Sequence, residues 1–178
     1  SGAAGGSPGA ADVSANIPPV LINEALTHTD LPQVDTIEIF NPTDGAVDIR
    51  GWYLTDDRRL PLKARIPDEL QFNMGPGAYA VINETRFRDN PGTVNNASLP
   101  GFALSAAGEG VYLFSSDAAG ALTGYSQGYE FGAAANGVSF GRYVSSDGQV
   151  HFVAQSPTSL GGPNSGPTVG PVVISEIF

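Results

Sequence analysis

The sequence predicts an all-β domain, a β-sandwich or barrel, and three observations carry this prediction. Glycine (23) and proline (14) are abundant among the 178 residues and follow no collagen-like period. Short apolar stretches alternate with a period of two and stop at turn-forming residues. Helical periodicity is poor, and the one helical candidate is a short turn near residues 84–88. A chain of this length buries about 70% of its unfolded surface, which is enough for one core without staples.

The expected strands follow one another along the chain, each bounded by turn signals. The strand at residues 36–40 ends at Asn41-Pro42-Thr43-Asp44-Gly45, whose residues favour tight bends. Ser146-Asp147-Gly148 lies between two apolar stretches and indicates a hairpin. The expected strand positions are 20–26, 36–40, 46–49, 52–55, 70–74, 78–82, 111–114, 120–123, 126–131, 138–143 and 150–153.

Trp52 is the expected centre of the core. On a strand, Trp52 and Tyr53 point to opposite faces, and Trp52 follows Gly51 where a sandwich places its large anchor. We therefore predict that Trp52 is buried between two sheets, with these neighbours: Ile37, Ile39, Leu54 and Val81.

The opening strand motif returns at the end of the sequence. Pro19-Val20-Leu21-Ile22-Asn23-Glu24-Ala25-Leu26 aligns with PVVISEIF at residues 171–178, and Pro, Val, Ile and Glu coincide. A repeat of about 150 residues indicates tandem units. The expected organisation is a linker at 1–19, a domain at 20–164, a linker at 165–171 and the first strand of a following unit at 172–178.

Residues 172–178 have an apolar strand pattern whose own sandwich is missing. An apolar edge of this kind recruits another edge. We expect it to pair with a sheet edge of a neighbouring molecule, or to replace that molecule's first strand. The residues expected to make this contact are Val172, Val173, Ile174, Ile177 and Phe178.

Six motifs in order resemble the lamin-tail domain, a module of nuclear lamins and of bacterial surface and secreted proteins. The resemblance implies an immunoglobulin-like β-sandwich, and it implies no activity because that fold hosts many roles. The long loop between Phe87 and Pro100 departs from the family pattern. The motifs are VLINEA (20–25), DTIEIFN (35–41), VDIRGWYLTD (47–56), MGPGAYAVI (74–82), GVSFGR (137–142) and SPTSLGGPN (156–164).

The charge argues against two classes of partner. Eight basic and eighteen acidic residues give a net charge of −10, a field that repels nucleic-acid phosphates and anionic membranes. Aspartates interleave with or flank the one basic stretch, so we expect no nucleic-acid partner. No apolar run is long enough to span a membrane. The basic stretch with its interleaved aspartates contains Arg50, Arg58, Arg59, Lys63 and Arg65.

Two G-x-S-x-G pentapeptides, centred on Ser126 and Ser139, fit the nucleophile elbow of a serine hydrolase. Asp147 and His151 follow in hydrolase order, but nothing helical follows either serine. A serine hydrolase therefore stays the lesser alternative. Glu24 and Glu38 lie in apolar strands, where we expect them to be structural: they face outward, or they partner a strand hydrogen bond or an arginine.

No cofactor is expected from the sequence, apart from an alternative structural calcium ion. The four aspartates Asp44, Asp48, Asp56 and Asp57 are its candidate ligands, since calcium takes hard oxygen ligands. Turn chemistry explains these aspartates equally well. His28 and His151 lie far apart and belong to no zinc motif.

The expected function is non-catalytic. We expect a structural or adhesive repeat module of a larger exported bacterial surface or extracellular protein, acting as a scaffold or assembly unit. Its expected partners are other copies or neighbouring domains, bound by strand pairing. The alternative is a carbohydrate-binding accessory module that binds extracellular polysaccharide, with Tyr125, Tyr129 and Tyr143 as surface candidates.

Overall fold

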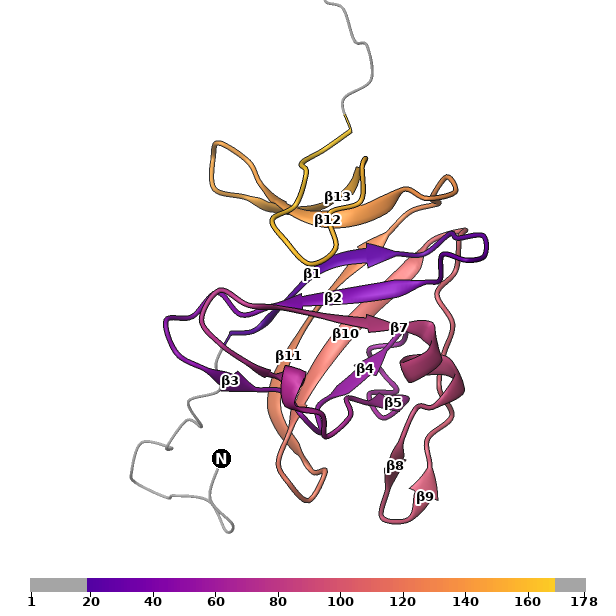
Figure 1. Ribbon diagram of the computed structural model, residues 1–178, viewed down its shortest axis with the longest axis vertical. Helices are drawn as coiled ribbons and strands as arrows, with labels where there is room; N and C mark the ends of the chain where they lie inside the picture. The colour runs from indigo at the N-terminus through magenta and orange to yellow at the C-terminus, as the bar shows by residue number, and fades with distance from the viewer. Residues whose placement is uncertain (1–18, 169–178) are drawn as a thin grey trace, which may run out of the picture.

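The alternating strands form two antiparallel sheets that pack face to face in the computed structural model, which describes residues 19–168 (Figure 1). In the first sheet, β1 (Leu21–Leu26) is central, with β12 (Ser139–Val144) on one side and β2 (Thr36–Phe40) on the other. The edges are β13 (Val150–Gln155) and β7 (Tyr79–Asn83). This all-β architecture confirms the predicted fold class.

The second sheet has the order β11-β10-β4-β5. Its two long strands, β10 (Glu109–Ser116) and β11 (Leu122–Phe131), form a hairpin. The two weak strand candidates at 120–123 and 126–131 are thus one strand. The short strands β4 (Tyr53–Thr55) and β5 (Ala64–Arg65) complete the sheet beside β10.

Short elements fill the connections. A bridge joins β3 (Val47–Asp48) to β6 (Asn73–Met74), and β8 (Thr93–Val94) pairs with β9 (Ala97–Ser98). One 3-10 turn covers Leu70–Phe72, and a π-helical turn covers Thr85–Asp89. Within residues 19–168, no helix is long and apolar enough to cross a membrane.

The β8–β9 hairpin gives structure to the loop that departs from the family pattern. Asn95 and Asn96 have φ values of 51° and 62°, as a two-residue hairpin turn requires. Val94 and Gly120 lie beside the outward-facing Tyr53, whose hydroxyl donates to the Gly120 carbonyl at 3.0 Å. Tyr53 is consequently fully buried although it points away from the core.

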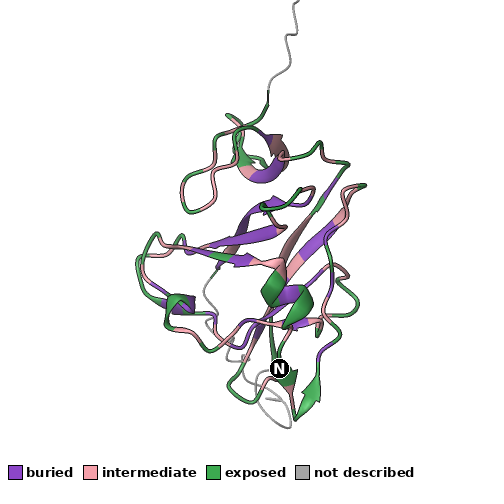
Figure 2. Cartoon of the chain, turned by 45° about the vertical axis from the view of Figure 1, so that its right-hand side comes forward, coloured by how far each residue is buried: buried purple, intermediate pink, exposed green. Residues whose placement is uncertain are grey.

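The core between the sheets contains four of the five predicted residues. Trp52 is 5% exposed, and the other three, Ile37, Ile39 and Leu54, are 1% exposed or less. Figure 2 shows the buried residues along the strands and the exposed residues mainly in the connections.

The prediction for Val81 is wrong, because its side chain is 42% exposed. Strand alternation in β7 turns Ala80 and Ile82 into the core and sends Val81 to the outer face, where it lies opposite Glu38.

Candidate functional site

Two buried glutamates dominate the outer face of the first sheet. Glu24 and Glu38 lie directly opposite each other in the β1–β2 register, and both are 0% exposed. Ile37 and Ile39 point into the core, so Glu38 between them points outward. The outer face is covered there by residues 156–168, which we call the closing loop; Figure 1 shows this loop over β1.

The closing loop holds both carboxylates through its own donors. The Ser159 N–H donates to Glu24 Oε1 at 3.0 Å and to Oε2 at 3.2 Å, and the Ser159 hydroxyl donates to Oε2 at 2.7 Å. The Gly161 N–H donates to Glu38 Oε2. Asn23 Nδ2 donates to Glu38 Oε1 at 2.8 Å. We call these contacts the carboxylate clasp.

Asn164 locks the far end of the closing loop onto the strands. Its Nδ2 donates to the Asn23 carbonyl at 3.0 Å and to the Arg142 carbonyl at 2.7 Å, while its Oδ1 accepts from Asn23 Nδ2 at 2.8 Å. Further on, the Thr168 N–H donates to the Ala154 carbonyl at 2.9 Å. Residues 165–168, expected to be a linker, therefore contact the domain.

Gly141 makes room for this packing. It lies opposite Glu24 on β12, and a Cβ at Gly141 would lie 2.4 Å from Gln155 Nε2. The buried Gln155 side chain occupies that space, and its Nε2 donates to the Ser159 hydroxyl at 3.2 Å.

The clasp is structural rather than catalytic in its chemistry. Burial raises the pKa of Glu38, and the charge of Glu24 adds to the effect, while hydrogen bonds from Asn23 and Gly161 oppose it. A catalytic carboxylate pair needs a cleft that a substrate can enter. Both glutamates face outward from the sheet, as expected, but they are buried under the closing loop and accept its hydrogen bonds.

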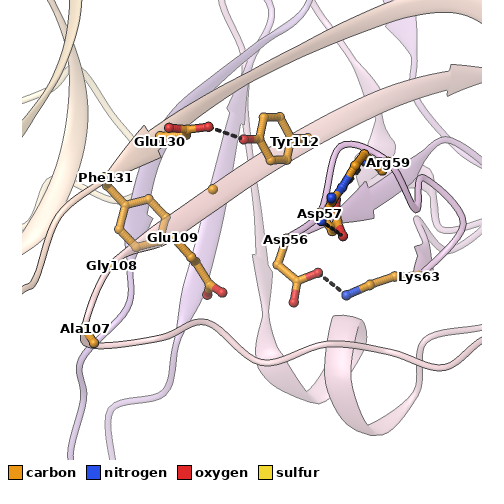
Figure 3. A pocket seen from close by; sticks show the side chains of 11 residues that line it. Asp56, Asp57, Arg59, Lys63, Ala107, Gly108, Glu109, Tyr112, Glu130 and Phe131 are labelled. Carbon is orange, nitrogen blue, oxygen red and sulfur yellow. Dashed lines mark hydrogen bonds and ion pairs between the residues drawn. The ribbon is translucent and has the colours of Figure 1, made fainter.

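A polar cleft of about 620 Å³ lies at the second sheet, where β10 begins and β11 ends (Figure 3). Lys63 pairs with Asp56, and Arg59 pairs with Asp57 at 3.1 Å. Burial raises the pKa of Glu109, although this carboxylate accepts a hydrogen bond from the Ser105 N–H. The cleft therefore carries both signs of charge.

Tyr112 separates this cleft from a second hollow of about 230 Å³. Its hydroxyl donates to Glu130 Oε1 at 3.2 Å. Burial raises the pKa of Tyr112, and the negative charge of Glu130 raises it further. We call the exposed outer face around this ring the Tyr112 surface, and the second hollow is lined by Arg58, Tyr112, Phe114, Ser126, Gln127 and Gly128.

Two glycines let the Tyr112 ring lie against the sheet. Gly110 precedes it by two residues on β10, and Gly128 is its cross-strand partner on β11. If Gly110 had a Cβ atom, it would lie 2.4 Å from the Tyr112 ring. A Cβ atom on Gly128 would lie 2.3 Å from the same ring. The ring therefore covers the backbone of both glycines.

The structure does not gather the four calcium candidates. Asp48 pairs with Arg50 at 2.5 Å, Asp56 and Asp57 form the two ion pairs of the cleft, and Asp44 is exposed in the turn after β2. Over residues 19–168, no three His, Cys, Asp or Glu side chains converge to hold a metal ion. Asp44 thus lies in a turn, and the other three aspartates lie in ion pairs.

The serine and histidine candidates for a serine hydrolase do not come together either. Ser126 is exposed in β11 of the second sheet, whereas Ser139 is buried in the first. Ser139 lies opposite Gln155 and His151 opposite Tyr143, so about four residues, or about 13 Å, separate this serine from the histidine. His28 lies elsewhere, with Nδ1 2.8 Å from the Ala134 carbonyl oxygen.

Two of the three tyrosines that were candidates for sugar stacking, Tyr125 and Tyr129, pack against the core instead. Tyr125 packs beside Trp52 with ring centroids 6.0 Å apart, its hydroxyl donates to the Val20 carbonyl at 2.7 Å, and burial raises its pKa to about 12. Tyr129 stacks on Phe152 at 4.6 Å, and Tyr143 is 38% exposed. Tyr112 was not among the candidates: the sequence shows one of the two glycines under its ring, Gly110, whereas Gly128 is found only from the strand pairing.

Most of the basic stretch is neutralised in place. Arg50, Arg59 and Lys63 pair with the aspartates already named, and Arg65 pairs with Asp68 at 3.2 Å. These pairs leave little concentrated positive charge for a phosphate backbone.

Comparisons with known proteins give one result. The model of the lamin tail domain family matches residues 14–139, which is more than half of the chain. The match stops at the start of β12, before β13 and the closing loop. No curated protein and no solved structure matches the chain.

Proposed function

Because this chain belongs to the lamin tail domain family, whose immunoglobulin-like domains are generally non-catalytic, we propose that it is a structural or adhesive repeat module of a larger exported bacterial surface or extracellular protein. Its role is to space other domains or to join copies into an assembly. The Gly/Pro/Ser-rich flanks, which have the composition of linkers, support a modular setting.

The observation that carries the proposal is the position of the closing loop. It seals the domain through the carboxylate clasp and still contacts β13 at Thr168. The repeat of the opening strand begins at Val172, which leaves residues 169–171 between two units. The four Cα–Cα steps from Thr168 to Val172 span at most about 14 Å, so successive units would be held close together.

Strand pairing is the proposed means of lateral assembly. Residues 172–178 lie outside the described part of the chain, and the argument for them comes from their sequence. Their apolar pattern copies that of β1, which pairs on both sides with antiparallel partners. A second molecule with an open sheet edge would satisfy the same backbone groups.

The oligomeric state in solution tests the proposal. Sedimentation equilibrium of the full chain is compared with that of a variant ending at Gly170 and of a full-length Ile174→Pro variant, in which proline removes a backbone donor. We expect concentration-dependent association of the full chain and its loss in both variants. Monomeric behaviour of all three proteins at high concentration, with equal stability, would refute strand donation.

A second candidate function is binding of extracellular polysaccharide. One observation favours it: the ring of Tyr112 lies on the outer face of the second sheet, between two hollows lined by hydrogen-bonding groups.

A further inference from the structure

We propose that the Tyr112 surface is a binding site for a neutral glycan chain, with pyranose rings stacked on Tyr112 and Phe114. The proposal rests on the second candidate function and is independent of strand assembly. Asp56, Asp57 and Ser126, named above for other chemistry, line the two hollows, but the sequence did not single out Tyr112 or Phe114.

The proposed stacking platform consists of the rings of Tyr112 and Phe114, and the first of these lies flat on the sheet. Gly110 and Gly128 have no side chains, and the ring of Tyr112 occupies the space where their Cβ atoms would stand. Val111 and Leu113 on either side are buried in the core, so Tyr112 belongs to the opposite, outer face of β10. A ring held flat in this way offers its free face to the apolar C–H face of a sugar.

Phe114 extends the platform along the strand. It follows Tyr112 by two residues, is half-buried on the same outer face, and lies opposite Ser126. Residues two apart on a strand are separated by about 7 Å. An oligosaccharide can therefore stack on both aromatic rings, whereas a monosaccharide can stack on only one. The site should bind an oligosaccharide more tightly than a monosaccharide.

The groups around the rings match the hydroxyls of sugars, which both donate and accept. Acceptors are the carboxylates of Glu130, Asp57 and Glu109, and donors are the side chains of Arg58 and Lys63. Figure 3 shows these carboxylates and Lys63 around the same cleft as the Tyr112 ring. The larger hollow, at about 620 Å³, is within the usual size range of ligand sites.

The balance of charge favours a neutral ligand over a cation. A cation over an aromatic face gains most where carboxylates nearby are unpaired. Here Asp56 and Asp57 already pair with Lys63 and Arg59, and the Arg58 guanidinium lines the hollow beside Tyr112 and Phe114. A bound cation would meet these positive groups as well as the carboxylates of Glu109 and Glu130, which form no ion pair within residues 19–168, whereas a neutral glycan uses both signs.

The test uses the full chain and defined probes: insoluble cellulose, chitin and mannan for sedimentation, then the soluble hexasaccharide of whichever binds for NMR titration. We expect binding to at least one of the three, with shifts of amides in β10 and β11. Tyr112→Ala should weaken binding about three- to tenfold, as one lost aromatic contact predicts.

Two variants make the result specific. Tyr112→Phe keeps the ring and loses the hydrogen bond to Glu130, so it should fold and retain most of the binding. Tyr143→Ala removes an exposed tyrosine from the other sheet and should bind as the parent does. The variant ending at Gly170 should also bind normally, which separates this proposal from strand assembly.

Four results would overturn the proposal. The first is that none of the three polysaccharides binds. The second is that a folded Tyr112→Ala protein binds as tightly as the parent. The third is that Tyr143→Ala weakens binding as much as Tyr112→Ala does. The fourth is that choline or a lysine-rich peptide shifts the amides around Tyr112 while glycans do not, which would identify a cation site.

Discussion

Glu24→Ala is the sharpest test of the carboxylate clasp. The substitution removes the acceptor of both Ser159 donors, the N–H at 3.0 and 3.2 Å and the hydroxyl at 2.7 Å. A hydrogen bond to a charged group contributes about 1.5–3 kcal/mol net. Two such donors are lost, but the repulsion between Glu24 and Glu38 is relieved and the burial of one carboxylate is avoided. We therefore expect unfolding free energy at pH 7 to fall by about 2–3 kcal/mol.

Urea unfolding, followed through Trp52 fluorescence, measures this loss, because Trp52 is the one tryptophan of the chain and is buried. For a domain of this size the melting temperature should fall by about 5–10 °C. Amide hydrogen exchange should quicken at Ser159 and Gly161 more than in β10. Asp44→Ala, at an exposed turn, is the matched control and should change stability by less than about 0.5 kcal/mol.

A double-mutant cycle separates the clasp from general loss of packing. Glu24→Ala and Ser159→Ala should be non-additive by about 1–2 kcal/mol, because each removes the partner of the other. Additive effects, or a Glu24→Ala protein with parental stability and undiminished protection of Ser159, would refute the clasp as the closure of the domain.

Three further predictions follow from the same structure. Trp52→Ala should cost about 3–5 kcal/mol in urea unfolding, and an unchanged midpoint would contradict its place in the core. Duplex DNA should not bind measurably by fluorescence anisotropy at about 150 mM salt, and a low-micromolar Kd weakened by Arg58→Ala would overturn this. The pKa of Tyr125 is raised to about 12, so between pH 10 and 12 the unfolded state loses a proton that the native state keeps. Stability should therefore fall as pH rises through that window, and less so in Tyr125→Phe; equal slopes in both proteins would show the native pKa to be unperturbed.

The sequence was most informative where local periodicity decides the structure. Ile37 and Ile39 alternate with polar residues, so their common face and their burial followed directly. Val81 lies in a continuous apolar run, and such a run does not say which of its members face the core. The resemblance to the lamin-tail family is confirmed by the family match, and it added the order of the motifs.

The two sites depend on contacts that sequence patterns do not specify. Glu24 accepts hydrogen bonds from Ser159, which lies 135 residues later in the chain. The closing loop that buries Glu24 has the Gly/Pro/Ser composition of a linker. The family motif placed Ser159 and Gly161 inside the domain, but their composition does not show that they cover two carboxylates. Tyr112 was passed over because tyrosine on a strand is ordinary, and its distinction comes from Gly128 on the neighbouring strand.

The clasp also bears on which form of strand assembly is easier to reach. Replacing β1 in a neighbour would break its pairing with β12 and with β2 and would expel Glu24 from the closing loop. An incoming strand would have to present Glu176 to the same donors. Addition at the edge strand β7 breaks none of these contacts, and Val81 already offers apolar surface there. Edge addition is therefore the form that the closed domain favours, and it leaves the amides of β1 as slow to exchange in the assembly as in the monomer.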